Sequence, residues 1–162
     1  MDPSLSLLYG WIKRTREEML AYTQSLPLEV YTFEHPEFAY GSIRNIHAHV
    51  ANCYLAWVGR FGLELERYQT KFEESSVPDV TAMRAKFLEL DEVLELACSS
   101  FNRVDEPFEL VRPGRDVLQV TRRWLIMHPI THEFHHKGQI LALGRVLGHP
   151  FPSSHDSDLT LP

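Results

Sequence analysis

The densest group of chemically useful side chains lies in the stretch HPITHEFHHKGQI, between residues 128 and 140. Four histidines fall within nine residues here: His128, His132, His135 and His136. A neutral imidazole binds zinc and similar ions well, and it also titrates near neutral pH. His132 and His136 are four residues apart, which puts both rings on one face of a helix. The stretch therefore predicts a metal site or an acid–base site.

A second cluster lies upstream, in the sequence IHAHV, which contains His47 and His49. Two ligands are too few for a metal site, so a third is expected from a facing helix. The spacing does not choose between His47 and His49, because they lie on opposite sides of the apolar stripe of their segment. Cys53 follows His49 by one helical turn and could add a thiolate, although such a cysteine is more often a small core residue.

Helical phase divides the four downstream histidines into two pairs. At about 100° per residue, His132 and His136 fall within about 20° of Leu125, in the middle of the apolar stripe. His128 and His135 fall at or beyond its margin, where flanking roles are expected. Two buried polar rings destabilise a fold unless they have partners, and a shared metal ion would satisfy both. The phase therefore favours metal binding over a helix that is merely rich in histidine.

Other chemistries compete for the same residues. The string HEFHH matches H-E-x-x-H, with Glu133 in the general-base position, so a metal-dependent hydrolase is an alternative. A di-iron centre needs Glu-x-x-His twice, and the chain has it only from Glu133 to His136. Histidine phosphotransfer modules carry their histidine three residues before a Lys-Gly pair, where this chain has Phe134. The di-iron centre and the phosphotransfer module are therefore disfavoured.

The elements that must position these residues follow from the spacing of the apolar side chains. Four segments show a helical period: about 5–26, 42–62, 79–101, and a last one from between 121 and 128 to about 147. Ser42 and Asp79 are predicted N-caps, and Gly148 is the predicted stop. Pro129 should kink or begin the last helix, and Gly138 is expected to allow close packing.

The connections complete the predicted architecture. The turn signal RPGR before the last helix predicts a short hairpin or irregular connection, and about 149–162 should form an irregular C-terminal strap. The pattern predicts one all-α domain over residues 1–162, a four-helix bundle. Such bundles commonly build metal sites between facing helices.

Composition excludes some classes of binding partner and indicates a cellular compartment. The chain has 162 residues and a net charge of −6, which argues against nucleic-acid binding. No apolar run of 18 residues is present, so no membrane span is expected. The first residues lack the features of a signal peptide, and two cysteines make no disulfide framework. A cytoplasmic protein is the expectation.

Two motifs, SIRNIHAHVANCYLAW and HPITHEFHHKGQILALGRVLG, together resemble the DinB-like family of damage-inducible bacterial proteins. The first family motif has a histidine with a tryptophan eight residues later, which His49 and Trp57 match. The second has two histidines four residues apart, then a basic residue, Gly and Gln, which His132, His136 and KGQ match. The family usually has arginine in place of this lysine. The resemblance covers nearly the full length and implies the metal ligands His49, His132 and His136.

The resemblance also carries expectations about function. It implies a bundle, often a homodimer, that holds a divalent metal, zinc or nickel. Characterised relatives include thiol transferases that use low-molecular-weight thiols such as bacillithiol. We therefore expect a thiol-dependent S-transferase acting on a small-molecule thiol and an electrophile, with a hydrolase or a non-catalytic metal-binding stress-response protein as alternatives. Gln139 and Glu133 are expected to support the ligands or the substrate.

Overall fold

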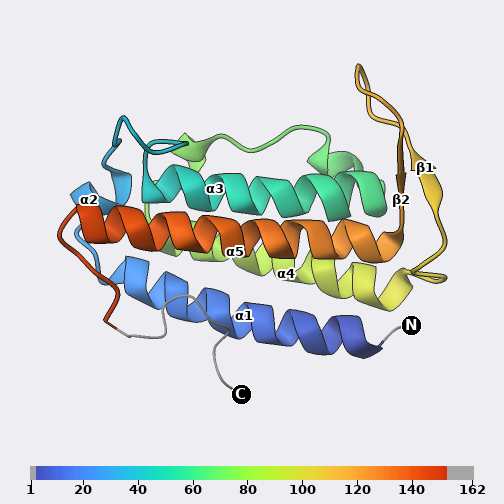
Figure 1. Cartoon of the computed structure of the whole chain (residues 1–162), viewed down its shortest axis with the longest axis horizontal. Coiled ribbons are helices and arrows are strands. Elements are labelled where there is room, and N and C mark those ends of the chain that lie inside the picture. Colours follow the sequence, from blue (N-terminus) through green and yellow to red (C-terminus); the bar gives the residue numbers. More distant parts are fainter. Residues whose placement is uncertain (1–2, 153–162) are drawn as a thin grey trace.

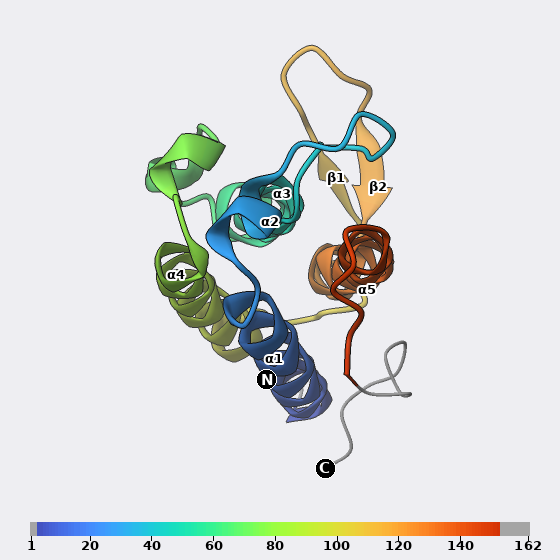
Figure 2. The ribbon, with the colours of Figure 1, turned by 90° about the vertical axis from the view of Figure 1, so that its left-hand side faces the viewer.

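Four long helices make up most of the protein in the computed structural model, which describes residues 3–152. They are α1 (Pro3–Gln24), α3 (Ile43–Tyr54), α4 (Val80–Ser100) and α5 (Arg122–Val146). The helices lie side by side, with α1 and α5 running in one direction and α3 and α4 in the other (Figure 1). Seen end on, they surround a shared apolar core to which all four contribute (Figure 2). The predicted all-α class is confirmed.

Local side-chain chemistry sets where three of these helices begin. The Ser42 hydroxyl accepts a hydrogen bond from the Asn45 amide at 3.1 Å, and the Asp79 carboxylate accepts one from the Ala82 amide at 2.8 Å. The Thr121 hydroxyl caps α5 in the same way. Each bond satisfies a backbone N–H that has no partner within the helix, and losing one such cap costs about 1 kcal/mol. The predicted caps at Ser42 and Asp79 are confirmed.

The second helical segment changes geometry partway along. After α3 ends at Tyr54, the chain continues as a π-helix, η1 (Leu55–Gly62). Three short elements were not predicted: α2 (Leu28–Thr32) and the 3₁₀ turns η2 (Glu66–Tyr68) and η3 (Glu74–Ser76). They are too brief to show an apolar period, which explains why the sequence pattern does not indicate them.

Helix α5 starts at Arg122, within the predicted interval of 121–128. Pro129 therefore lies inside the helix, which excludes the predicted alternative that the helix begins there. The expectation of close packing at Gly138 is wrong, because that residue is exposed and a Cβ there would meet nothing within 4 Å. Close packing occurs at Gly144 instead, where a Cβ would overlap the hydroxyl of Tyr22 from α1.

The predicted hairpin before α5 is present. Strands β1 (Phe108–Leu110) and β2 (Leu118–Val120) pair antiparallel, with Phe108 opposite Val120. In the RPGR turn, the Arg115 amide donates to the Arg112 carbonyl at 3.0 Å, and Gly114 adopts φ +67°, as glycine readily does. Gly148, with φ +85°, ends α5 as predicted. Most of the predicted C-terminal strap lies outside the described residues.

Among residues 3–152, no helix has the length and apolar character that crossing a bilayer would require.

Candidate metal centre

Three imidazoles from two helices converge on one point. His49 projects from α3, and His132 and His136 project from the facing helix α5. Their candidate ligand atoms all lie within 4.8 Å of one another. The Nε2 atom of His132 lies 2.7 Å from that of His49 and 3.1 Å from that of His136. Among the described residues, this group of three could hold a metal ion.

The protonation of these rings fits a metal site. Burial, followed by the neighbouring imidazoles, lowers the pKa of both His49 and His132 to about 4. Burial also lowers the pKa of His136, against the opposing effect of its bond to Gln139. The rings are therefore neutral near pH 7, the form in which imidazole binds metals. The near polar partners of these nitrogen atoms are one another, and a divalent ion would fit this nitrogen donor set.

Gln139 controls the orientation of one ring. Its Oε1 lies 2.6 Å from Nδ1 of His136, and its Nε2 lies 3.2 Å from Nε2 of His135. The amide nitrogen can only donate, which fixes the amide oxygen toward His136. Nδ1 of His136 must then carry the proton, so its Nε2 presents a lone pair to the other two histidines. The structure thus places Gln139 beside the candidate ligands, on the predicted side of α5.

The other histidines between residues 3 and 152 do not join this group. His47 is buried and its Nδ1 shares a hydrogen bond of 3.2 Å with the hydroxyl of Tyr31 from α2. His128 stacks parallel to His132 with ring centres 6.1 Å apart, and His135 is exposed. The prediction of two buried rings in the α5 stripe holds for His136, but His132 is only half-buried. A helical wheel gives the direction of a side chain but not how closely the facing helices cover it, so it does not show this difference.

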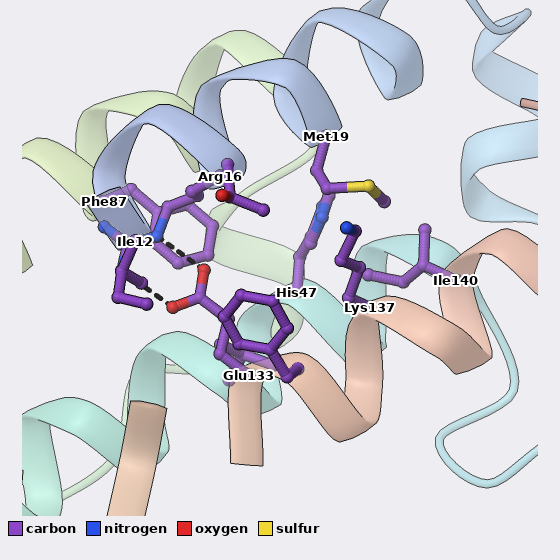
Figure 3. A pocket seen from close by; sticks show the side chains of 11 residues that line it. Ile12, Arg16, Met19, His47, Phe87, Glu133, Lys137 and Ile140 are labelled. Carbon is purple, nitrogen blue, oxygen red and sulfur yellow. Dashed lines mark hydrogen bonds and ion pairs between the residues drawn. The ribbon is translucent and has the colours of Figure 1, made fainter. Parts of the chain in front are cut away.

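Two further candidates lie away from the three nitrogen atoms. Cys53 is half-buried, and burial raises the pKa of its thiol to about 12, so it does not supply a thiolate near pH 7. Glu133 points toward Arg16 of α1 and lines a small pocket between the helices (Figure 3). Its carboxylate accepts bonds of 2.7 and 2.9 Å from Arg16 and one of 2.5 Å from the Tyr54 hydroxyl.

Tyr40 is a site residue that sequence reasoning missed. Its ring stacks on His49 with centres 4.0 Å apart and meets the edge of the His136 ring. Its φ of +66° is uncommon for a residue other than glycine, and such strain often occurs at functional sites. The Asn45 side chain and the Ser42 amide hold it by donating to its carbonyl at 3.0 and 2.9 Å. A loop tyrosine gives no periodic signal that could have revealed it.

Aromatic rings also flank the other side of the centre. Trp124 stacks on His128 at 4.7 Å, and Trp57 meets His128 edge-on at 4.8 Å. The tryptophan of the upstream motif therefore contacts His128 rather than the three candidate ligands. These two rings are connected to the three histidines through His128, which stacks on His132.

Comparison with known proteins agrees with this geometry. The sequence model of the DinB family matches residues 1–158. The chain is also similar to Protein DinB of Bacillus subtilis (strain 168), with 23% identity over 147 residues that cover 88% of this chain and 85% of that protein. A match across nearly the whole chain, together with the three convergent histidines, shows that the chain belongs to the DinB family.

Proposed function

We propose that this protein is a metal-dependent enzyme that transfers a low-molecular-weight thiol, such as bacillithiol, to a small electrophile. The observation that carries the proposal is the convergence of His49, His132 and His136, with candidate ligand atoms within 4.8 Å. Membership of the DinB family supports it. Zinc or nickel is the proposed ion, because imidazole nitrogen suits both.

The residues around the centre have distinct tasks in this proposal. The three histidines would hold the ion. When bound, a divalent ion would supply Lewis acidity, which lowers the pKa of a thiol and favours the reactive thiolate near neutral pH. Gln139 keeps Nε2 of His136 directed at the site. Tyr40 stacks on His49 and is partly exposed, so its ring would pack against the electrophile.

The position of Glu133 favours a thiol over water as the nucleophile. Hydrolases with the H-E-x-x-H pattern use this glutamate as the general base for water. Here both of its oxygens accept hydrogen bonds from Arg16 and Tyr54 in the core. A thiol is far more acidic than water, so its activation depends less on a protein base. This difference supports the transferase proposal over the hydrolase alternative.

Metal content tests the first part of the proposal. Elemental analysis of protein purified from its own host should find close to one zinc or nickel ion per chain. His132→Ala should lose the ion, because it removes the nitrogen that contacts both of the other rings. His135→Ala is the matched control, since it removes an exposed imidazole from the same stretch of α5 and leaves the three nitrogen atoms in place. Equal metal content in both variants would contradict the ligand assignment.

Turnover tests the second part. The metal-loaded protein should consume an electrophilic dye with bacillithiol, mycothiol or glutathione as the thiol, and His132→Ala should not. Loss of metal in His132→Ala with no turnover by wild type under any thiol would favour the non-catalytic stress-response alternative. Consumption of an ester or amide without any thiol would favour the hydrolase.

A further inference from the structure

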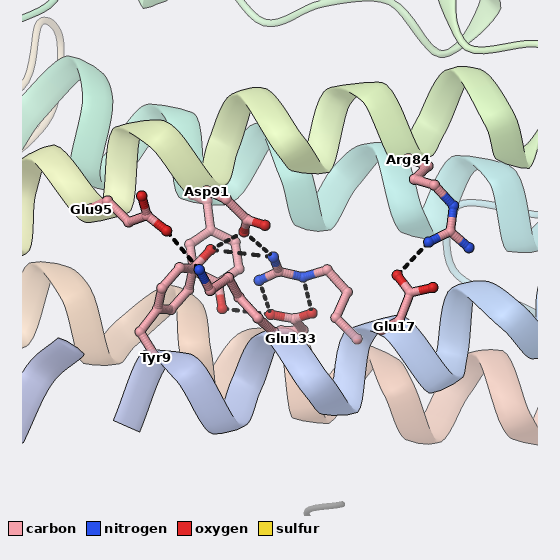
Figure 4. A network of polar contacts seen from close by, with 9 residues as sticks. Tyr9, Glu17, Arg84, Asp91, Glu95 and Glu133 are labelled. Carbon is pink, nitrogen blue, oxygen red and sulfur yellow. Dashed lines mark hydrogen bonds and ion pairs between the residues drawn. The ribbon is translucent and has the colours of Figure 1, made fainter. Parts of the chain in front are cut away.

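A network of five buried or half-buried polar side chains joins all four long helices on the inner side of α5 (Figure 4). Its members are Tyr9 and Arg16 from α1, Tyr54 from α3, Asp91 from α4 and Glu133 from α5. Arg16 donates to both oxygens of Glu133 and also to Asp91 at 2.6 Å. The hydroxyls of Tyr9 and Tyr54 donate to Asp91 and Glu133, respectively. The network thus has one cation between two carboxylates.

Stability alone is a weak reason for this arrangement. Only 4% of Arg16 is exposed, so its charge and that of Glu133 are both taken out of water. Apolar residues of similar volume often stabilise a core as well as a buried ion pair does, because desolvation offsets the attraction. What the pair adds is geometry, since a guanidinium that binds both oxygens of a carboxylate fixes its position and its plane.

The fixed carboxylate lies next to the candidate metal centre along the chain. Glu133 directly follows His132, so anchoring its side chain sets both the rotation and the axial position of α5 at that ligand. Tyr54 is five residues after His49, at the end of the same helix. The bond of 2.5 Å from Tyr54 to Glu133 therefore ties together the two helices that carry the three histidines.

The backbone of α5 lacks one hydrogen bond in this same region. Pro129 lies inside the helix and has no N–H, so the carbonyl of Leu125 loses its usual partner. A helix bends most readily where such a bond is missing. Glu133 is one turn beyond Pro129, which is where a side-chain anchor best restricts movement of the histidine-bearing half of α5.

From these observations we propose that Glu133 is a positioning residue, held by Arg16 and Tyr54, that sets the distance from His49 on α3 to His132 and His136 on α5. This inference rests on the metal-binding function proposed above. It gives the glutamate of the H-E-x-x-H string a role on the core side of the helix in place of proton transfer to water.

Two tyrosine variants separate positioning from mere stability. Tyr54→Phe removes the hydroxyl that links α3 to α5 and leaves the Arg16–Glu133 pair intact. Tyr9→Phe is its matched control, because it removes a buried hydroxyl from the same network between α1 and α4, away from the ligand helices. Both full-length variants would be titrated with Co²⁺, and both the affinity and the visible absorption bands of the ion would be compared with wild type. Urea unfolding of the metal-free proteins measures the stability lost by each.

We expect Tyr54→Phe to weaken Co²⁺ binding roughly tenfold and to shift the absorption bands, as loss of an outer partner does in other sites. Tyr9→Phe should keep the wild-type affinity and spectrum while losing similar stability. Glu133→Asp should behave like Tyr54→Phe, since it preserves a charge for Arg16 but withdraws the carboxylate from Tyr54.

The outcomes distinguish this inference from the proposed function. Equal loss of Co²⁺ affinity in both tyrosine variants, or wild-type binding by Tyr54→Phe, would overturn the positioning role and leave the metal site standing. Failure of wild type to bind Co²⁺ or Zn²⁺ at all would overturn both.

Discussion

Around residues 132–136, the two faces of α5 differ in the partners that their polar side chains have. On the inner face, Glu133 has a matched cation, Arg16, and both of its oxygens accept hydrogen bonds. On the outer face, His132 has two other imidazoles as its nearest polar partners, all of the same kind. The inner network pairs each charged group with groups of opposite charge or with hydroxyls, whereas the three outer nitrogen atoms have one another as their near polar partners.

The two faces therefore differ in how their polar groups are satisfied. On the inner face, a charged group has partners of opposite charge within the chain, as Arg16 does. On the outer face, imidazoles with lowered pKa values have one another as near polar partners, and a cation from outside could bind all three. Damage to the inner face should therefore destabilise the fold and disturb the metal site through Glu133, while damage to the outer face should mainly change metal binding.

The largest effect is expected from Glu133→Ala. It leaves the Arg16 charge buried, with Asp91 as its remaining carboxylate partner. Removing one member of a buried pair costs about 3–5 kcal/mol of the free energy of unfolding, which urea denaturation of the metal-free protein measures. His132→Ala should lower the same quantity less, by about 1 kcal/mol, because His132 is half-buried and its hydrogen-bond partners are neutral imidazoles. Similar losses in both variants would remove the contrast.

The second effect is the stabilisation of wild type by metal. Zinc at about a thousand times its dissociation constant should raise the free energy of unfolding by about 4 kcal/mol, since it binds the folded chain through a site built from two helices. Calorimetry with and without zinc measures this as a shift in melting temperature. The shift should vanish in His49→Ala and persist in His47→Gln, because His47 lies outside the group of three. A full shift in His49→Ala would contradict the site.

The helices and the shared face of two histidines can be predicted from the sequence, because both depend on periodicity. The apolar repeat predicted the all-α class and the extents of the long helices, and caps such as Ser42 and Asp79 have chemistry that is local. Helical phase placed His132 and His136 together on one face. Convergence with His49 needed the resemblance to a family, since spacing alone left His47 equally eligible.

The parts that sequence reasoning missed depend on contacts between distant segments. The string H-E-x-x-H predicts a general-base or supporting role for Glu133, yet its partners Arg16 and Tyr54 lie 117 and 79 residues away. Tyr40 lies in a loop whose path is set by backbone bonds, such as that from the His35 amide to the Gly41 carbonyl. Neither arrangement has a period or a local motif that a single sequence displays.

A third, smaller effect concerns the support of one ligand. Gln139→Leu removes the oxygen that accepts the Nδ1 proton of His136, so the ring can rotate or change tautomer. Zinc affinity should fall about 10- to 100-fold, with little change in the stability of the metal-free protein. Gln139→Glu is the matched control, because its carboxylate still accepts that proton. A competition titration with a chelating dye measures both, and equal losses would show that the hydrogen bond is unimportant.

The smallest expected effect is a difference in stability between two variants of Tyr40, whose ring stacks on the outer face of the site. Tyr40 holds φ +66° while its ring stacks on His49. Tyr40→Ala and Tyr40→Gly both remove the ring, so they should weaken zinc binding equally. They differ in the backbone, because glycine adopts positive φ without the steric cost that alanine meets. Tyr40→Gly should therefore be about 1 kcal/mol more stable to urea than Tyr40→Ala. Equal stability would mean that the loop leaves this conformation once the ring is gone, and that stacking on His49 is what holds the strained backbone in place.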